Sequence, residues 1–261
     1  MDILKADRLC ISFGGLAAVK DVSFTIPQGK IISLIGPNGA GKTTIFNILT
    51  GFYQGDSGTV SLCGRIINDV SPELRVGLGM ARTFQNVRLF RQMTVLQNTL
   101  IGNRRHMQYT VFDALLHTKK WAEGEKQAKA ECCALLERIG LLADKDNVCA
   151  NLPYGKQKKL EIVRALASRP TLLLLDEPAA GLNPQETQEL SEFVRTLLDD
   201  GLTILLIEHD LSMVMEISDY VYVVNQGELL AEGPPDTVKS DQSVIDAYIG
   251  RGGIEKLAES E

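Results

Sequence analysis

A glycine-rich segment of the chain has the residue types and spacing that bind phosphate groups. It reads Gly36-Pro37-Asn38-Gly39-Ala40-Gly41-Lys42-Thr43 and fits the pattern G-x-x-x-x-G-K-[ST]. The glycines let the backbone turn tightly and bring its N–H groups close to an anion. A helix that begins at the end of the segment directs the positive end of its dipole at the phosphates. We therefore expect a bound nucleotide phosphate here rather than a glycine-rich turn without a ligand.

Two side chains of this segment have expected roles of their own. The Lys42 ammonium is expected to pair with the β- and γ-phosphates, and the Thr43 hydroxyl is expected to be a ligand of Mg²⁺. The residues expected to bind the nucleotide here are Gly36, Pro37, Asn38, Gly39, Ala40, Gly41, Lys42, Thr43 and Thr44.

Two adjacent carboxylates supply what a phosphate-bound metal needs. Asp176 and Glu177 follow four leucines, Leu172–Leu175, which read as a strand buried in a parallel sheet. Ligands collect at the carboxyl edge of such sheets. We expect Asp176 to orient Mg²⁺ and Glu177 to polarise the attacking water as a general base. The alternative is that the two acids merely cap the next helix. Four leucines and two acids alone would be weak evidence, but together with the phosphate-binding segment upstream they favour the catalytic interpretation.

Three further residues indicate which kind of nucleotide hydrolase this is. The tetrapeptide Asn-Lys-x-Asp, with which GTPases read guanine, does not occur in the sequence. Phe13 could stack on adenine, although a lone aromatic residue is as often part of a core. Gln85 lies between the two phosphate-site elements in the chain. His209 follows an apolar run, and the edge of a parallel sheet places it beside the γ-phosphate; the alternative is a solvated or capping histidine.

The elements that position these residues follow from the pattern of apolar and polar residues. Expected strands are 22–26, 31–35, 171–175 and 202–207. Expected helices are 43–49, a long one through 128–139, and one that begins after Pro153. Residues 53–67 read as turn-rich β structure, residues 220–231 read as a hairpin, and residues 108–124 read as less regular.

Composition restricts the class of protein. The chain has 261 residues, of which 44% are hydrophobic and 23% charged, as in ordinary globular proteins. The net charge of −6 argues against broad nucleic-acid binding. Five cysteines without a CxxC pair favour reduced packing residues over a disulfide framework or a zinc site. The start lacks a signal-peptide pattern and the apolar runs are short, so we expect a soluble protein that can still sit against a membrane.

Together these residues resemble the nucleotide-binding subunit of ABC transporters over nearly the whole chain. The resemblance implies that Phe13 stacks on adenine, that Gln85 senses the metal and couples to the membrane partner, and that His209 contacts the γ-phosphate. It implies ATP and Mg²⁺ as ligands and an α/β fold of the P-loop NTPase (ABC ATPase) type. That fold has a RecA-like core, an N-terminal antiparallel β region and a helical subdomain. The implied sets are Glu177, His209 and Gln85 for catalysis, and Thr43, Gln85 and Asp176 for the metal.

The sequence departs from that family at its signature. The usual Leu-Ser-Gly-Gly-Gln appears as Leu152-Pro153-Tyr154-Gly155-Lys156, and Pro153 offers neither a hydroxyl nor an N–H. The resemblance leaves Tyr154, the Gly155 N–H and the start of a helix near Lys156 to meet the ATP of a second subunit. The family's aspartate for cross-talk between subunits is also replaced, by Asn183.

With these departures the sequence resembles one subfamily, which comprises the ATP-binding subunits of bacterial high-affinity branched-chain amino acid importers. The segments that carry this narrower resemblance are 81–90, 154–162 and 177–184. Residues 104–124 also look like that group's characteristic insertion. Urea and amide importers share much of the pattern, so the transported solute stays open.

The resemblance also implies an organisation and a set of partners. It predicts one ABC ATPase domain over 1–261, with a core lobe of 1–86 and 166–250, a helical lobe of 87–165 and a polar tail of 251–261. The expected partners are transmembrane permease subunits, a second ATPase subunit (the same chain or a sister) and, indirectly, a solute-binding protein, with no nucleic acid. The expected location is peripheral, at the cytoplasmic face of a prokaryotic cell membrane.

Two alternatives come from other classes of protein. One is a soluble ABC ATPase that acts on ribosomes or DNA, which the single cassette, the lack of a long coiled coil and the acidic charge disfavour. The other is a regulatory module that holds ATP without hydrolysing it, which the presence of Glu177 and His209 disfavours.

Overall fold

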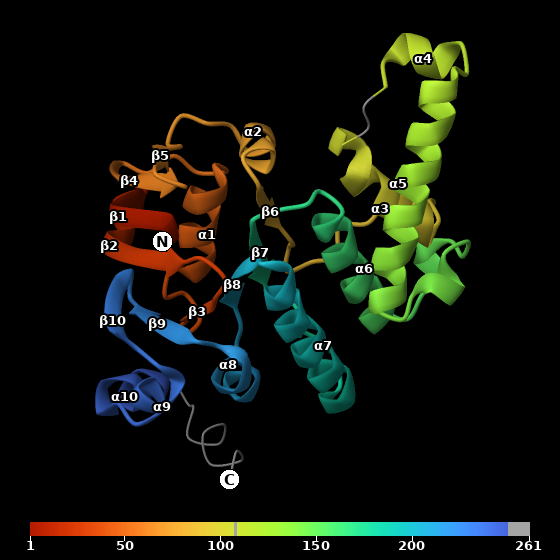
Figure 1. Cartoon of the computed structure of the whole chain (residues 1–261). Coiled ribbons are helices and arrows are strands. Elements are labelled where there is room, and N and C mark those ends of the chain that lie inside the picture. The colour runs from red at the N-terminus through yellow and green to blue at the C-terminus, as the bar shows by residue number, and fades with distance from the viewer. Residues whose placement is uncertain (107–108, 250–261) are drawn as a thin grey trace. The chain divides into compact units, whose positions relative to one another are not determined.

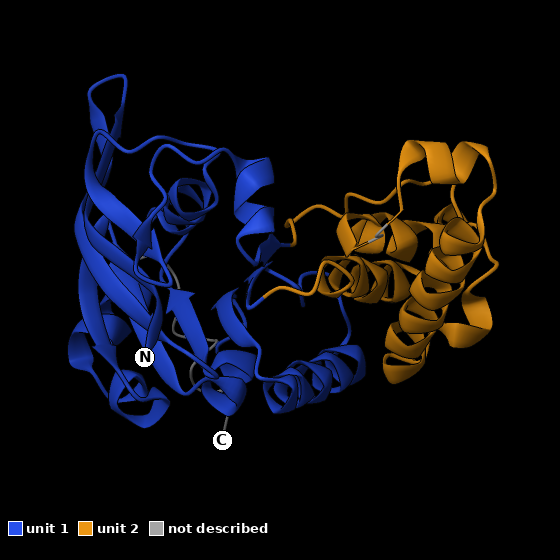
Figure 2. Cartoon of the chain, turned by 45° about the horizontal axis from the view of Figure 1, so that its top comes forward, with its two compact units in different colours: residues 1–82, 171–261 blue, residues 83–170 orange. Residues whose placement is uncertain are grey.

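The chain forms two compact units. The computed structural model describes residues 1–106 and 109–249. Unit 1 comprises residues 1–82 and 171–261, and unit 2 comprises residues 83–170 (Figure 2). The lobes expected from the sequence change at 86/87 and 165/166, and that division as functional lobes stays a prediction. The expected polar tail, 251–261, lies outside the described residues.

An antiparallel sheet opens unit 1. Its strands are β1 (Asp2–Phe13), β2 (Leu16–Pro27), β4 (Ser57–Leu62) and β5 (Arg65–Ile66), in the order β2-β1-β4-β5 (Figure 1). β1 and β2 form a hairpin in which Phe13 faces Leu16 across the Gly14-Gly15 turn. Both glycines have positive φ, a conformation that other residues rarely adopt. The predicted N-terminal antiparallel region is thus confirmed.

A second, mostly parallel sheet carries the rest of unit 1. Its strands are β3 (Ile31–Ile35), β6 (Met80–Arg82), β7 (Leu172–Asp176), β8 (Thr203–Ile207), β9 (Tyr220–Asn225) and β10 (Glu228–Gly233). Their order is β10-β9-β3-β8-β7-β6, and only the pairing of β10 with β9 is antiparallel. Every residue of β3, β7 and β8 is buried, as their continuous apolar runs predict. The hairpin near residues 220–231 is confirmed, whereas the three-residue strand β6 was not anticipated.

Apolar layers cover both faces of this sheet. On one face a large cluster joins it to α1 (Lys42–Thr50) and to the antiparallel sheet through Phe24, Phe46 and Leu174. On the other face a smaller cluster joins Ile35 and Val223 to α8 (Leu211–Ile217), α9 (Pro235–Lys239) and α10 (Gln242–Ile249). Unit 1 also contains α2 (Pro72–Gly77) and α7 (Pro184–Thr196). The sheet is therefore a rigid platform whose strand ends can hold side chains in fixed positions.

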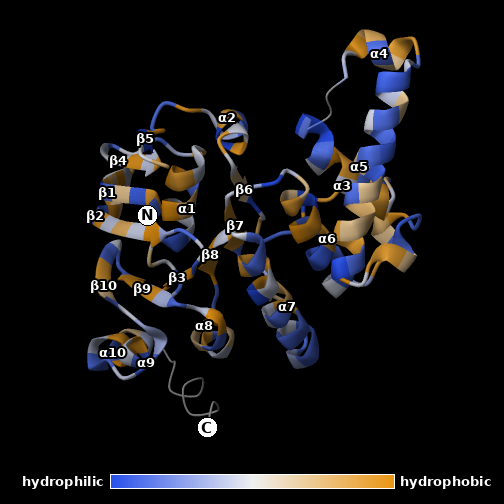
Figure 3. Cartoon of the chain, viewed as in Figure 1, coloured by the Kyte–Doolittle hydropathy of each residue, from blue (hydrophilic) through white to orange (hydrophobic). Residues whose placement is uncertain are grey.

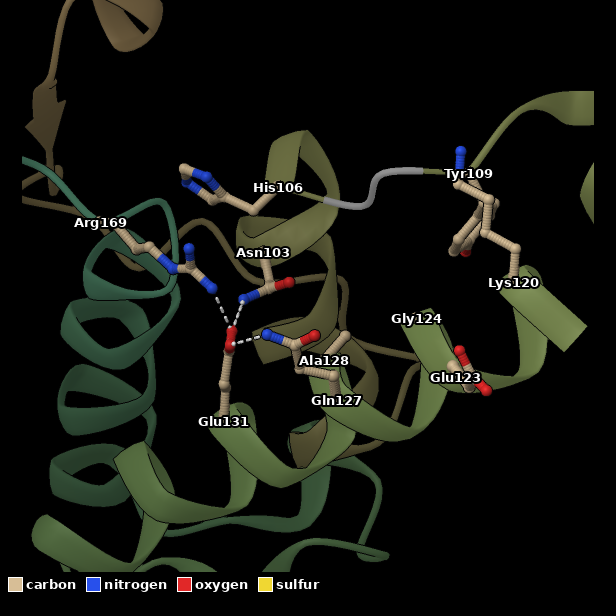
Figure 4. A pocket seen from close by; sticks show the side chains of 10 residues that line it. All are labelled: Asn103, His106, Tyr109, Lys120, Glu123, Gly124, Gln127, Ala128, Glu131 and Arg169. Carbon is tan, nitrogen blue, oxygen red and sulfur yellow. Dashed lines mark hydrogen bonds and ion pairs between the residues drawn. The ribbon is translucent and has the colours of Figure 1, made fainter.

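Unit 2 is built on three packed helices. They are α3 (Val95–Asn103), α5 (Lys119–Arg138) and α6 (Tyr154–Leu166), with the short α4 (Val111–Leu115) between α3 and α5. A Cβ at Gly102 would lie 2.0 Å from the Arg164 carbonyl oxygen, so α3 and α6 can approach this closely only because residue 102 is glycine. In α5, the Glu131 carboxylate accepts hydrogen bonds from Asn103, Gln127 and Arg169 (Figure 4).

One expectation about unit 2 is wrong, and another is confirmed. Residues 109–124 are not irregular, because they contain α4 and the first turns of α5. Thr110 caps α4 in a capping box with Asp113, and the Thr118 hydroxyl caps α5 by accepting from the Trp121 N–H. Helix α6 begins at Tyr154, directly after Pro153 as expected, and two residues before Lys156. Proline before the first helical residue suits this start because the lost N–H has no partner in the helix.

Candidate nucleotide site

Four parallel strands end at the same edge of the six-stranded sheet. β3, β8, β7 and β6 are neighbours in that order. Loop 36–41 follows β3, Glu177 follows β7, Glu208-His209 follows β8, and Arg82 ends β6. The structure therefore brings the glycine-rich loop, Asp176, Glu177 and His209 to one edge, where ligands of open α/β sheets bind.

The glycine-rich loop has a backbone that requires glycine. Gly36, Gly39 and Gly41 have φ of +150°, +79° and +106°. A Cβ at Gly36 would lie 2.0 Å from the Val224 carbonyl oxygen, and one at Gly41 would lie 2.7 Å from the Ala18 carbonyl oxygen. Gly41 is also the N-cap of α1 and supplies no side-chain cap, so the first-turn N–H groups are left to bind an anion.

Lys42 lies folded against this loop. Its ammonium donates to the carbonyl oxygens of Gly36 at 2.6 Å and Pro37 at 3.0 Å, and the side chain is only 5% exposed. Burial lowers the pKa of Lys42 to about 8, against the opposing effect of the carboxylates of Glu177 and Asp176. The loop thus holds a cation that is still protonated at neutral pH, with carboxylates close enough to stabilise its charge.

Asp176 is held by an arginine that the sequence analysis missed. The Arg82 guanidinium donates to Asp176 Oδ2 at 2.7 Å, to Asn47 Oδ1 at 2.7 Å and to Thr50 Oγ1 at 3.0 Å. Both members of the ion pair are buried. The arginine therefore ties the end of β7 to helix α1. The only sequence signal for it is a cation at the end of a short apolar run, which is too weak to assign a partner.

This tie places Thr43 and Asp176 on facing surfaces. Residues 43, 47 and 50 are four and three apart, so in α1 they lie along one face of the helix. Because Asn47 and Thr50 bind Arg82 and Arg82 binds Asp176, that face is directed toward the Asp176 carboxylate. Thr43 itself is exposed, so its hydroxyl is accessible to a ligand.

Glu177 and His209 form a close pair. His209 Nε2 lies 2.6 Å from Glu177 Oε1. An ionised carboxylate only accepts hydrogen bonds, so Nε2 is the donor in this pair. Glu177 is nearly buried and has φ of +49°, a left-handed conformation that is strained for a residue with a side chain. Such strain persists where surrounding contacts fix the backbone, and it is common at active sites.

Glu208 supplies those contacts, and sequence reasoning missed it as well. Its buried carboxylate accepts from the Ala179 N–H at 2.6 Å and from the His209 N–H at 3.0 Å. One side chain thereby ties the loop after Glu177 to the loop that carries His209. Burial raises the pKa of Glu208, and the Ala179 N–H opposes that shift most strongly. Its position directly before His209 was the available signal, but no local pattern reveals the bond to Ala179.

Two other positions singled out in the sequence also lie in unit 1. Phe13 ends β1, is 46% exposed and stacks edge-to-face on Tyr53 with ring centroids 5.3 Å apart. An exposed aromatic ring supports the adenine role over the core alternative, and the role stays a prediction. Asn183 is the N-cap of α7 and forms a capping box with Glu186, which explains locally why this position holds asparagine.

The remaining candidate residues belong to unit 2. Tyr154 and Gly155 are the first two residues of α6, whose N-cap Pro153 has no side chain that can cap the helix. Buried Lys158 donates to the Gln85 carbonyl oxygen at 2.8 Å, and its ammonium lies 5.9 Å from the centre of the Tyr154 ring. Lys158 therefore joins Gln85 to the signature segment within this unit. Their approach to a nucleotide held by unit 1 stays a prediction.

Comparison with known proteins shows the family of the chain. The family described as "ABC transporter" matches residues 19–180, and that described as "Branched-chain amino acid ATP-binding cassette transporter" matches residues 228–254. The "High-affinity branched-chain amino acid transport ATP-binding protein LivG" of Salmonella typhimurium is 47% identical over 95% of this chain and 98% of its own. The corresponding protein BraF of Pseudomonas aeruginosa is 43% identical over the same shares.

A solved structure shares the whole fold. The ADP conformation of an ATP-binding cassette of an ABC transporter superposes with a TM-score of 0.84 and is 34% identical, covering 96% of this chain and 100% of its own. The chain therefore belongs to the ABC transporter family, and it is one of the family's ATPases with the predicted P-loop fold. Within residues 1–106 and 109–249, every helix is too short or too polar to span a bilayer.

Lys42 predicts a pH dependence of nucleotide binding. Below its pKa of about 8 the ammonium attracts phosphate, and above that value the neutral amine does not. We expect the affinity for metal-free ADP, measured by isothermal titration calorimetry, to fall about tenfold from pH 7 to pH 9. The Lys42→Arg variant, which keeps its charge over this range, should bind more weakly without that slope. Equal wild-type affinities at both pH values would contradict the assignment.

The bonds of Glu208 predict that its loss lowers kcat and leaves KM nearly unchanged. Replacing Glu208 with Ala leaves the Ala179 and His209 N–H groups without their acceptor, so the two catalytic loops are no longer tied together. We expect kcat for ATP to fall by about tenfold or more while KM changes little, with a loss of stability of about 2 kcal/mol. Glu208→Gln keeps one acceptor oxygen and should recover part of kcat. An Ala variant that is less stable but turns over normally would limit Glu208 to a structural role.

Proposed function

We propose that this chain is the ATP-hydrolysing subunit of a bacterial-type importer of branched-chain amino acids. The observation that carries the proposal is the 47% identity to a branched-chain amino acid transport ATP-binding protein over 95% of this chain and 98% of the relative. Support comes from the match of residues 228–254, far along the chain from the phosphate loop, to a family described by the same solute class. That second match favours amino acids over the urea and amide importers.

The geometry of unit 1 supports the proposed roles of the catalytic residues. The Glu177 carboxylate is the general base that takes a proton from the attacking water. The 2.6 Å bond from His209 fixes its orientation. In the proposed mechanism the same histidine also contacts the γ-phosphate. Lys42 exchanges its bonds to the Gly36 and Pro37 carbonyl oxygens for bonds to phosphate oxygens. Phe13 stacks on the adenine ring.

The donors at this edge fit Mg²⁺. Thr43 and Asp176 supply hard oxygen ligands on facing surfaces, and Mg²⁺ at phosphate sites usually needs only one or two protein carboxylates. Among the described residues there is no group of three or more His, Cys, Asp or Glu side chains that could hold a metal, which is the pattern zinc requires. Gln85 is the proposed third ligand. When bound, Mg²⁺ neutralises charge that develops on the phosphates.

A second ATPase subunit completes the proposed site. The uncapped start of α6 at Tyr154 and Gly155 is one end of a 13-residue helix whose dipole favours an anion. In a head-to-tail dimer, this helix start of one subunit meets the γ-phosphate held by Lys42 of the other. The permease subunits bind near exposed Gln85 and Phe90, at the cytoplasmic face of the membrane.

The role of Glu177 predicts a trapped state. Glu177→Gln removes the base while keeping the size of the side chain, so ATP should bind but hydrolyse at least about 100-fold more slowly. ATP should then hold two subunits together, which size-exclusion chromatography would detect as a dimer. Glu192→Gln, the same change at an exposed position of α7, is the matched control and should leave turnover unchanged. Normal turnover in Glu177→Gln would contradict the assigned base.

Solute uptake tests the substrate class. In a strain that lacks this gene but retains its permease, the wild-type chain should restore uptake of labelled leucine, isoleucine and valine. The Glu177→Gln variant should not, whereas Glu192→Gln should. Restored uptake of urea or short amides in place of these amino acids would contradict the proposed solute and leave the ATPase assignment standing.

A further inference from the structure

Helix α4 exposes an unusual concentration of large apolar side chains. Its Val111, Phe112 and Leu115 are 85%, 76% and 71% exposed, and its C-cap Leu116 is 72% exposed. Among the described large hydrophobic residues, only two others exceed 70%, Met1 and Leu16. Figure 3 shows α4 as an apolar segment beside the mostly polar start of α5. An apolar group this concentrated on a protein surface marks an interaction site.

Polar contacts hold α4 in place without its apolar side chains. The Thr110 hydroxyl and the Asp113 carboxylate cap its start reciprocally. Asp113 also accepts from the Thr118 hydroxyl at 3.0 Å, and its carbonyl oxygen accepts from the Thr118 N–H at 3.1 Å. These bonds fix a helix that is too short to be stable alone. The apolar side chains are therefore displayed by a fixed support and are not part of the core of unit 2.

Cationic side chains flank the apolar helix. Arg104 and Arg105 precede it, Lys119 and Lys120 follow it, and all four are exposed. Between positions 104 and 120 the only carboxylate is Asp113, which is engaged in the caps. The next carboxylates along the chain are Glu123 and Glu125 of α5, and Glu123 lies near Lys120. This segment is therefore locally basic in a chain whose net charge is −6.

We propose that α4 and its four flanking cations form a surface that contacts an anionic lipid bilayer. The apolar side chains enter the boundary between headgroups and acyl chains, while the cations pair with lipid phosphates. Lysine and arginine suit this position because their long stems stay in apolar surroundings while their charges reach the headgroups. A protein groove would have to offer both an apolar floor and acceptors for four cations, and an anionic bilayer supplies both. The contact goes beyond the proposed function, in which permease subunits alone bring the chain to the membrane.

The sole tryptophan of the chain gives a direct readout. Trp121 lies in the first turn of α5, and its ring stacks edge-to-face on His117, whose centroid is 4.7 Å away. It therefore reports on the polarity around α4. The full-length chain would be titrated with vesicles of phosphatidylglycerol and phosphatidylcholine, and with phosphatidylcholine vesicles alone, without nucleotide or permease.

We expect Trp121 emission to shift to shorter wavelength and the chain to sediment with the anionic vesicles only. The double variant Phe112→Ser with Leu116→Ser should weaken binding by about tenfold or more. The pair Lys119→Glu with Lys120→Glu should weaken it by at least about tenfold and reduce its sensitivity to salt. Matched controls are Ile66→Ser with Leu74→Ser, exposed apolar residues of unit 1, and Lys126→Glu with Lys129→Glu, farther along α5. The apolar control should bind as wild type, and the charge control should lose less than the Lys119/Lys120 pair.

Several outcomes would overturn the proposal. One is no wild-type binding to anionic vesicles, and another is binding that survives the Phe112/Leu116 change. Absence of vesicle binding together with self-association that this change removes would assign α4 to a second copy of the chain. Absence of vesicle binding together with a loss of permease assembly would assign it to a protein partner. Because the vesicle assay needs neither ATP nor permease, its failure is distinguishable from failure of the proposed function.

Discussion

The buried ammonium of Lys42 is the charge around which the nucleotide site of unit 1 is arranged. From the start of α1 it donates hydrogen bonds to the carbonyl oxygens of Gly36 and Pro37, so the lysine joins the two ends of the loop. This closure is possible because Gly36 and Gly41 pass within contact of neighbouring strands, where a Cβ would collide with a carbonyl oxygen. A phosphate group offers the same acceptor chemistry as the two carbonyls with a full negative charge, and it is a stronger partner for the ammonium.

Each carboxylate at this edge has a neighbour that fixes its direction. Asp176 is bound by Arg82, Glu177 by His209, and Glu208 by two backbone N–H groups. A buried charge is tolerated only when such partners compensate for its lost hydration. The partners come from β6 and from the loops after β7 and β8, so the parallel sheet sets the spacing of the site. This prepared arrangement lets a bound nucleotide meet oriented groups without a large rearrangement of unit 1.

Local sequence patterns predicted the parts of this molecule that local physics controls. The runs that became β3, β7 and β8, the glycine spacing and the acids after Leu175 are of this kind. Helix α4 escaped prediction because five residues show no period and their stability comes from the caps at Thr110 and Thr118. The bonds of Arg82 and Glu208 join distant segments, so no single window of sequence contains them. The roles proposed for Gln85 and for the start of α6 depend on how units and subunits meet, and the spacing of residues in the sequence does not determine that arrangement.

The most direct test of the central claim is a crystal structure of this chain with Mg²⁺ and a non-hydrolysable ATP analogue. The account predicts that Lys42 Nζ leaves the Gly36 and Pro37 carbonyl oxygens and bonds to oxygens of the β- and γ-phosphates. It also predicts Mg²⁺ between the Thr43 hydroxyl and Asp176, with Arg82 still bound to that carboxylate. A structure in which Lys42 keeps both carbonyl bonds, while the phosphates lie elsewhere on the edge of the sheet, would contradict it.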